Sequence, residues 1–261
     1  MTAATAATAA AVLYAARKAH AVLGDPPGGV ADLAEAYRIQ EAFVALMEAD
    51  DGPTVGWKVA LTSPVMQQMC GVDHPCEGAV LRDRVQASPA ACDTSRLGRL
   101  GVEAEIALTI GRDMPAAGGP YTAESAAASV ASARAAIELV DDQNADYSAI
   151  TAIRLVANNS LNAGIVVGPE VSDWRGLDLA GLRGAMLIDG DVVAEGTGAD
   201  ILGHPLNAAI WLANSLNARG RMLRAGDVVM CGSFVRTQFP TAGQTVTCRV
   251  EGLGEAVVKV E

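Results

Sequence analysis

Histidine and closely spaced cysteine are scarce in this sequence. Its 261 residues include three histidines and five cysteines, and no cysteine belongs to a Cys-x-x-Cys pair. The odd number and irregular spacing of the cysteines fit neither a disulfide framework nor a zinc site. A histidine-rich metal site is excluded by the same shortage of ligands. We expect reduced thiols in a cytoplasmic protein.

Positive charge and long apolar runs are also lacking. The formal net charge is −11, which argues against nucleic acid or an anionic membrane surface as the partner. An anionic substrate is compatible with this charge, because a local cation can reverse the field. No uninterrupted apolar run is long enough to span a bilayer. The Ala/Thr-rich segment Met1–Ala10 lacks the basic start and apolar centre of a signal peptide, so we predict no membrane association.

The residues that are abundant point to one aliphatic core. Hydrophobic residues make up 51% of the chain while aromatic residues make up 4%, and the length suffices for one large domain. No repeat or interdomain linker is visible. Helical patterns lie near the two ends and strand patterns fill the rest, which favours an α+β fold with a large mixed β-sheet and flanking helices. We predict a single domain over residues 1–261, with a helical region at about 1–50.

Three helices are predicted from periodicity and end signals. They cover Val30–Glu48, Ala123 to about Ala135, and Pro205 to about Ala218. His204 directly precedes the last of these helices, and we interpret it as a cap in preference to a catalytic group.

Turn residues locate two further features. Asp189-Gly190 suits the type I′ turn of a β-hairpin. Gly71–Gly78 is rich in turn residues and is predicted to be a loop. Asp141 and Asp142, which follow an apolar β-prone run, are interpreted as solvated turn residues.

The segment Gly101–Ile110 alternates charged and apolar residues in a way typical of a strand. In a strand, Glu103 and Glu105 share one face with their side chains about 7 Å apart. Two carboxylates at this spacing repel each other unless a positive charge lies between them, and a divalent cation with oxygen ligands supplies it. A solvated strand face remains the alternative.

Other polar residues interrupt apolar segments. Lys58 lies inside an otherwise apolar strand, where it is either a site residue or an edge residue that reaches water along its stem. Asn158 and Ser160 belong to a polar cluster that precedes an apolar strand. Such a cluster either lines a pocket or satisfies backbone groups.

Five segments of the chain together resemble one known family. They are Gly56-Trp57-Lys58-Val59-Ala60-Leu61-Thr62-Ser63, Val102-Glu103-Ala104-Glu105-Ile106-Ala107, Ala136-Ile137-Glu138, Gly203-His204-Pro205-Leu206-Asn207-Ala208 and Ala225-Gly226-Asp227-Val228-Val229. In this order they are similar to the 2-oxopent-4-enoate (2-hydroxypentadienoate) hydratases of the fumarylacetoacetate hydrolase superfamily. The resemblance runs from about Val30 to the C-terminus and implies a fumarylacetoacetate hydrolase-like fold.

The resemblance also implies a metal-dependent hydro-lyase of aromatic-compound degradation. It assigns a divalent cation, Mg²⁺ or Mn²⁺, to Glu103, Glu105 and Glu138, and it makes Lys58 the active-site lysine. The substrate is a small 2-oxo or 2-hydroxydienoic acid, and the protein is a homo-oligomer that can associate with other enzymes of its pathway. Asn158 and Ser160 are the expected substrate-binding residues. A cation polarises the 2-oxo group, and a nearby ammonium stabilises the charge that develops on its oxygen.

The chain departs from the family pattern in the predicted loop Gly71–Gly78. The family carries Pro-Asp-aromatic-Gly where this chain has Pro75-Cys76-Glu77-Gly78. Glu77 is therefore a candidate replacement for the lost aspartate, with a role in proton transfer. The family's Ser-Arg pair reads Asp142-Gln143 here, which removes a cation that could hold a substrate anion.

Three other functions are compatible with the sequence. A 2-oxo acid decarboxylase of the 4-oxalocrotonate type uses the same stabilised enolate but releases carbon dioxide. An acylpyruvate C–C hydrolase needs an activated water near the carbonyl, and the His74 to Glu77 spacing does not establish one. A catalytically silent homologue would bind a 2-oxo acid without turnover.

Overall fold

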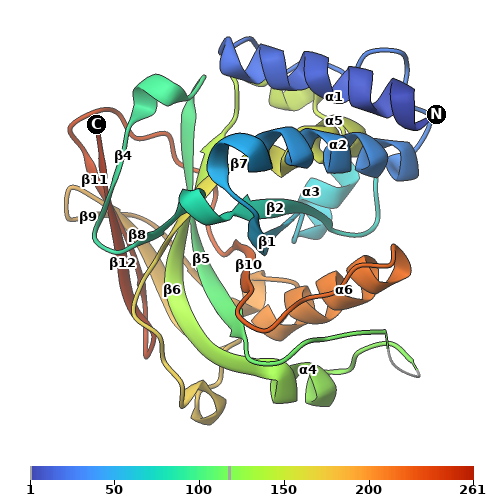
Figure 1. Ribbon diagram of the computed structural model, residues 1–261. Helices are drawn as coiled ribbons and strands as arrows, with labels where there is room; N and C mark the ends of the chain where they lie inside the picture. Colours follow the sequence, from blue (N-terminus) through green and yellow to red (C-terminus); the bar gives the residue numbers. More distant parts are fainter. Residues whose placement is uncertain (1, 117–118) are drawn as a thin grey trace.

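A bent, seven-stranded mixed sheet forms the centre of the protein (Figure 1). The computed structural model describes residues 2–116 and 119–261. Strand pairs β1–β10 and β3–β7 are parallel, and the other neighbours in this sheet are antiparallel. Across the sheet the strands are β2 (Cys76–Leu81), β1 (Thr54–Ala60), β10 (Val228–Ser233), β5 (Leu100–Ile110), β6 (Val130–Asp141), β7 (Asn162–Val167) and β3 (Val85–Ala87).

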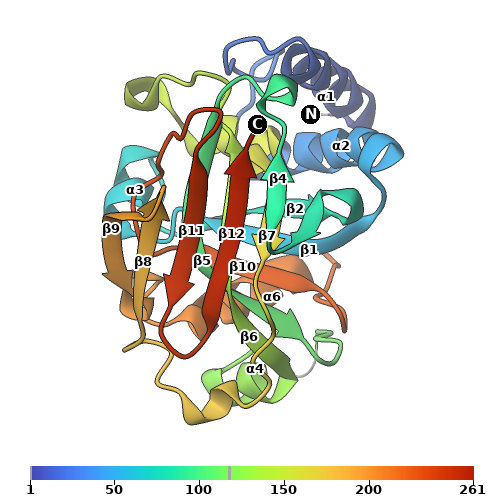
Figure 2. The ribbon, with the colours of Figure 1, turned by 90° about the vertical axis from the view of Figure 1, so that its left-hand side faces the viewer.

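A second, five-stranded sheet packs against the first (Figure 2). Its order is β4 (Ala90–Cys92), β12 (Gly254–Val260), β11 (Thr245–Val250), β8 (Arg183–Ile188) and β9 (Asp191–Thr197). Strands β11 and β12 lie against β6. The predicted hairpin between β8 and β9 is confirmed, with Asp189 and Gly190 at φ 52° and 92°, as a type I′ turn requires.

Helices cover the large sheet in two groups (Figure 1). One group packs together as α1 (Ala3–Lys18), α2 (Leu33–Asp51) and α5 (Ala152–Ala157). The other includes α6 (Pro205–Ala218), which packs on β10, and α4 (Ala123–Ser129), which contacts α6. A short helix, α3 (Pro64–Met69), follows β1. Within residues 2–116 and 119–261, no helix combines the length and apolar character needed to cross a bilayer.

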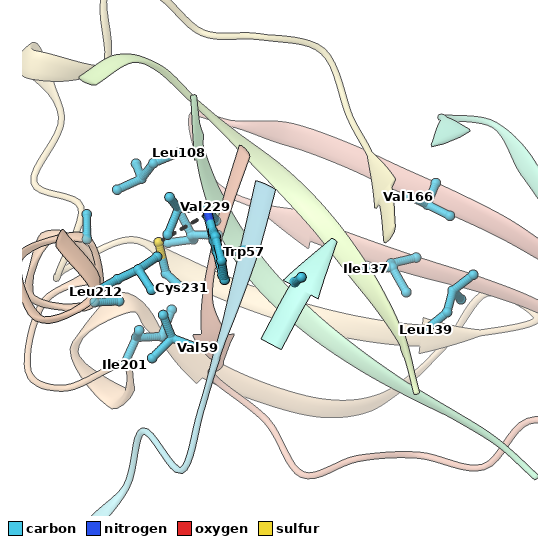
Figure 3. Packing of buried hydrophobic residues seen from close by; sticks show 14 of the residues in the cluster. Trp57, Val59, Leu108, Ile137, Leu139, Val166, Ile201, Leu212, Val229 and Cys231 are labelled. Carbon is cyan, nitrogen blue, oxygen red and sulfur yellow. Dashed lines mark hydrogen bonds between the residues drawn. The ribbon is translucent and has the colours of Figure 1, made fainter. Parts of the chain in front are cut away.

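Helix α6 has the start that its sequence predicted. The Leu206 backbone N–H donates to Nδ1 of His204 at 3.0 Å, so His204 is the cap. Burial lowers the pKa of His204, which keeps this nitrogen available as an acceptor. The apolar face of the helix meets the sheet, where Leu212 lies beside Val59 and Cys231 (Figure 3).

The prediction of one helix from Ala123 to about Ala135 is wrong beyond Ser129. The chain turns there into β6, which pairs with β5 on one side and β7 on the other. Ala133, Ala135 and Ala136 are fully buried in this strand. Their small side chains fit the space between packed layers, and that packing outweighs the helix propensity of alanine.

The solvated-turn interpretation of Asp141 and Asp142 is also wrong, since both side chains are buried. Asp141 lies 3.4 Å from Nε of Arg17 in α1. Asp142 accepts a hydrogen bond from Nε of Arg99 at 2.7 Å. These arginines compensate the buried charges, and both come from distant parts of the sequence.

The predicted loop Gly71–Gly78 ends earlier than expected. Its last three residues, from Cys76 onward, begin β2 and pair with β1 in antiparallel register. They are buried, so pairing with a central strand overrides the turn-forming composition of this segment.

Candidate metal centre and active site

Glu103, Glu105 and Glu138 meet at the middle of the large sheet. Glu103 and Glu105 alternate along β5, and Glu103 pairs directly with Glu138 of β6. Because paired residues project to the same face of a sheet, all three carboxylates share one side. One oxygen from each lies within 4.8 Å of the others. The strand periodicity and the shared face that the sequence predicted are therefore present.

Each carboxylate is held in place by one neutral donor. The Thr237 hydroxyl donates to Glu103 Oε1 at 2.5 Å, and the Gly232 N–H donates to Glu105 Oε2 at 2.7 Å. The Asn162 side-chain amide donates to Glu138 Oε1 at 2.9 Å. Thr237, Gly232 and Asn162 were not singled out as site residues from the sequence. Only Asn162 had a usable signal, since it ends a polar cluster just before a strand.

Lys58 of β1 projects into the same cluster. Its Nζ is 3.1 Å from Glu138 Oε2, and its side chain is only 5% exposed. The alternative of an edge lysine that reaches water is therefore wrong. Burial alone lowers the pKa of this ammonium, but the three carboxylates outweigh burial and raise the pKa above its ordinary value. Lys58 is protonated at neutral pH.

The carboxylates themselves are in an unfavourable electrostatic setting. Glu105 and Glu138 are fully buried while Glu103 is partly exposed. Burial, together with the neighbouring carboxylates, raises the pKa of Glu105 well above its usual range. The pKa of Glu138 is also raised, mainly by burial.

A divalent cation fits this set of residues. One ammonium balances one of the three carboxylates and leaves two negative charges, which a doubly charged ion would neutralise. Oε1 of Glu105 is buried and has no hydrogen-bond partner among the residues that the structure describes. Carboxylate oxygens are the ligands that hard cations such as Mg²⁺ prefer. The donor set and the uncompensated buried oxygen therefore both suit such an ion.

Glu77 does not join this cluster. In the β1–β2 pair, Lys58 is opposite Gly78 and Glu77 is opposite Val59, so Glu77 belongs to the other face of the pair. Its carboxylate is fully buried, forms an ion pair with Arg219 and accepts a hydrogen bond from the Tyr37 hydroxyl at 2.7 Å. The proposed replacement of the family aspartate is not supported by this placement.

Cys76 and Ser160 lie on the Lys58 side of β2. The Cys76 sulfur is 3.7 Å from the Ser160 hydroxyl, and burial raises the thiol pKa to about 11. The Ser160 hydroxyl also donates to the backbone oxygen of Glu77 at 2.9 Å. The thiol is therefore neutral at ordinary pH and supplies no negative charge to the site.

The polar cluster around Asn158 mostly satisfies backbone groups. Asn158 donates to the backbone oxygen of Arg154 at 2.9 Å, within its own helix end. Asn159 both accepts from and donates to the backbone of Ala79 in β2. For Asn158, these contacts favour a role in satisfying backbone groups over a role in lining a pocket.

Comparison with known proteins bears on this geometry. The family described as fumarylacetoacetate (FAA) hydrolase C-terminal matches residues 79–261. The chain belongs to the fumarylacetoacetate hydrolase family. A similar curated protein is the 2-keto-4-pentenoate hydratase of Burkholderia vietnamiensis (strain G4 / LMG 22486), 37% identical over 228 residues, which cover 87% of this chain and 85% of that protein.

Two solved structures extend the similarity over the whole chain. Both are 4-oxalocrotonate decarboxylase from Pseudomonas putida G7, one complexed with calcium and acetate and the other with magnesium and adipate. They superpose with TM-scores of 0.89 and 0.90 at 26% and 25% identity, covering 100% of this chain and 99% of each of those chains. The predicted fumarylacetoacetate hydrolase-like fold is confirmed, and the decarboxylase of this fold was solved with calcium and with magnesium.

Proposed function

We propose that this protein is a metal-dependent hydro-lyase that adds water to 2-hydroxypenta-2,4-dienoate or a related 2-oxo acid formed in aromatic-compound degradation. The observation that carries the proposal is the group of three glutamates, two of them fully buried, with oxygens within 4.8 Å and a lysine ammonium beside them. The similarity to a 2-keto-4-pentenoate hydratase over 87% of the chain supports this choice of substrate class.

In this proposal Glu103, Glu105 and Glu138 hold Mg²⁺ or Mn²⁺. Such an ion would supply Lewis-acid polarisation of the 2-oxo group of a substrate. The hydrogen bonds from Thr237 and Asn162 hold the carboxylates of Glu103 and Glu138 in place before an ion binds. This lowers the entropy cost of ordering these side chains on binding.

Lys58 has the role of stabilising negative charge on the substrate. Its ammonium is held by Glu138, is protonated at neutral pH, and stands on the same sheet face as the three carboxylates. When the dienol becomes the 2-oxo form, electron density passes through the C2 oxygen. A fixed ammonium nearby favours that charge more in the transition state than in the ground state. Water then adds at C4 of the unsaturated ketone, with its hydroxyl on C4 and a proton on C3.

A second candidate function is decarboxylation of a 4-oxalocrotonate-type 2-oxo acid. The full-length likeness to a 4-oxalocrotonate decarboxylase favours it, and the same charge stabilisation at the C2 oxygen would serve it. The two reactions differ in the bond that changes: hydration forms a C4–O bond, whereas decarboxylation breaks a C–C bond and releases carbon dioxide.

Turnover of the purified protein with Mg²⁺ tests the proposal. With 2-hydroxypenta-2,4-dienoate, we expect loss of the dienoate absorbance and formation of a 4-hydroxy-2-oxo acid, identified by NMR. Carbon dioxide release from 4-oxalocrotonate without hydration of the dienoate would instead assign the decarboxylase. A stable complex without either product would overturn both reactions and leave a binding protein.

We also propose that the protein acts as a cytoplasmic homo-oligomer. All five cysteines are free and buried, which suits a reducing compartment. Size-exclusion chromatography with light scattering measures the assembly directly, and a monomer at micromolar concentration would exclude the oligomer.

A further inference from the structure

A polar cavity of about 560 Å³ lies between the C-terminal ends of α1 and α2, and none of the three clustered glutamates lines it. Its four cationic residues come from three separate segments. Arg17 and Lys18 end α1, Arg84 follows β2, and Arg96 precedes β5. Asp50 and Asp51 are the only acidic residues among its lining, so cationic side chains exceed acidic ones by two in a chain of net charge −11.

Arg17 provides the strongest sign that this cavity is a built site. Its side chain is 10% exposed, and its Nη2 donates to the backbone oxygen of Asn162 at 2.7 Å. Its Nε faces Asp141 at 3.4 Å. The remaining nitrogen, Nη1, is buried, and no residue in the described part of the chain forms a hydrogen bond with it. A buried guanidinium donor without an acceptor is costly, and an anion in the cavity would supply the acceptor.

Two of the other lining cations are already paired with the two acidic residues of the lining. Lys18 is paired with Asp50 at 2.8 Å, and Arg84 is paired with Asp51 at 3.0 Å. Arg96 is exposed, and no ion pair includes it within the described part of the chain. Even when the Arg17–Asp141 pair is counted, the walls retain an excess positive charge.

We propose that this cavity binds a small dianion that carries carboxylate or phosphate groups. Arg17 supplies a buried donor without an acceptor among the described residues, and Arg96 supplies a second, solvent-facing charge. These two arginines come from separate segments, which suits a ligand with two charged ends or several anionic oxygens, because each charge then meets a different donor.

The site is connected to the glutamate cluster through one residue. Asn162 accepts from Arg17 with its backbone oxygen and donates to Glu138 with its side-chain amide at 2.9 Å. An anion that draws the Arg17 guanidinium toward itself would loosen Asn162 and, with it, the orientation of Glu138. This regulatory consequence rests on the proposed metal site, whereas the anion site itself does not.

Calorimetric titration of metal-free protein with succinate and, separately, with inorganic phosphate tests the anion site. We expect millimolar or tighter binding of at least one anion, and the tighter of the two identifies the carboxylate or phosphate class. Arg96→Glu should weaken binding at least tenfold. The matched control Arg112→Glu changes an exposed arginine outside the cavity and should leave the affinity within twofold. Absence of binding, or equal binding by Arg96→Glu, would overturn the site.

The connection to Glu138 has its own measurement. Mg²⁺ affinity of the wild type should fall at least threefold when the cavity is saturated with the bound anion, and this change should vanish in Arg96→Glu. An Mg²⁺ affinity that is unchanged by the anion would overturn the regulatory consequence. Failure to bind Mg²⁺ under any condition would instead count against the proposed function, while the metal-free titration would still decide the anion site.

Discussion

Replacement of Glu105 by Gln should change metal binding and metal-free stability in opposite directions. The substitution removes a charge but keeps the shape, and the new side-chain carbonyl can still accept the hydrogen bond from the Gly232 N–H. The ion loses one of three anionic ligands. We expect divalent-cation affinity to fall at least tenfold, which corresponds to about 1.4 kcal/mol or more.

The metal-free protein should become more stable at pH 8. Carboxylate oxygens of the cluster lie within 4.8 Å, and two unit charges at such a distance repel by about 3 kcal/mol at an effective dielectric constant near 20. Loss of the attraction to Lys58 offsets part of the relief. A net gain of about 1–2 kcal/mol corresponds to a rise of about 2–4 °C in Tm for a chain of this length.

The sign of the pH dependence follows from the pKa of Glu105, which burial and the adjacent carboxylates raise in the folded state. The folded protein therefore binds this proton more tightly than the unfolded chain does, and stability from the group declines as pH rises above the unfolded pKa. Gln at this position carries no such penalty. The stabilisation by Glu105→Gln should be smaller at pH 5 and largest at pH 8.

Differential scanning calorimetry at the two pH values and Mn²⁺ titration provide the measurements. Glu195→Gln is the control, because Glu195 is an exposed strand glutamate outside the cluster. It should leave ion affinity and Tm unchanged. A Glu105→Gln protein with wild-type ion affinity, or one destabilised at pH 8, would refute the electrostatic account of the cluster.

Three further substitutions probe the neighbours of the cluster. Glu77→Gln leaves the Arg219 charge without its partner and should destabilise the protein by about 2–4 kcal/mol in urea unfolding. The affinity for the divalent cation should stay within twofold of the wild type. Loss of turnover without loss of stability would instead place Glu77 in the reaction. Lys58→Met should lower turnover at least 100-fold in the dienoate assay while cation affinity rises, because a competing positive charge is removed; normal turnover would exclude its role. Gly232 has a φ of 109°, which alanine rarely adopts, and an added Cβ would lie 2.4 Å from the Thr62 side chain. Gly232→Ala should therefore lower the free energy of unfolding by about 2 kcal/mol or more in thermal unfolding. Wild-type stability would contradict this expectation.

Sequence periodicity was most predictive for the long strands. Alternation placed Glu103 and Glu105 on one face without any knowledge of neighbours, because a strand repeats every two residues. The cap at His204 and the turn at Asp189-Gly190 were also predictable, since each depends on residues adjacent in the chain. The link from these two glutamates to Glu138 came from family resemblance.

Features that depend on distant partners were beyond such reasoning. Asp141, at the end of β6, can be buried because Arg17 of α1 forms an ion pair with it. The placement of Glu77 depends on the register of β2 against β1, and a shift of one residue would have turned it toward Lys58. The alanines of β6 have high helix propensity, and only the strands on either side explain their conformation.

The direct pairing of Glu103 with Glu138 has a consequence for how this protein can change. Both residues are anchored in the interior of long antiparallel strands, so their separation is fixed by the backbone ladder and not by any connecting segment. Insertions or deletions in the surrounding loops can alter the shape of the entrance while the spacing of the carboxylates stays the same. Selection for a new substrate can therefore act on the loops without first rebuilding the carboxylate cluster.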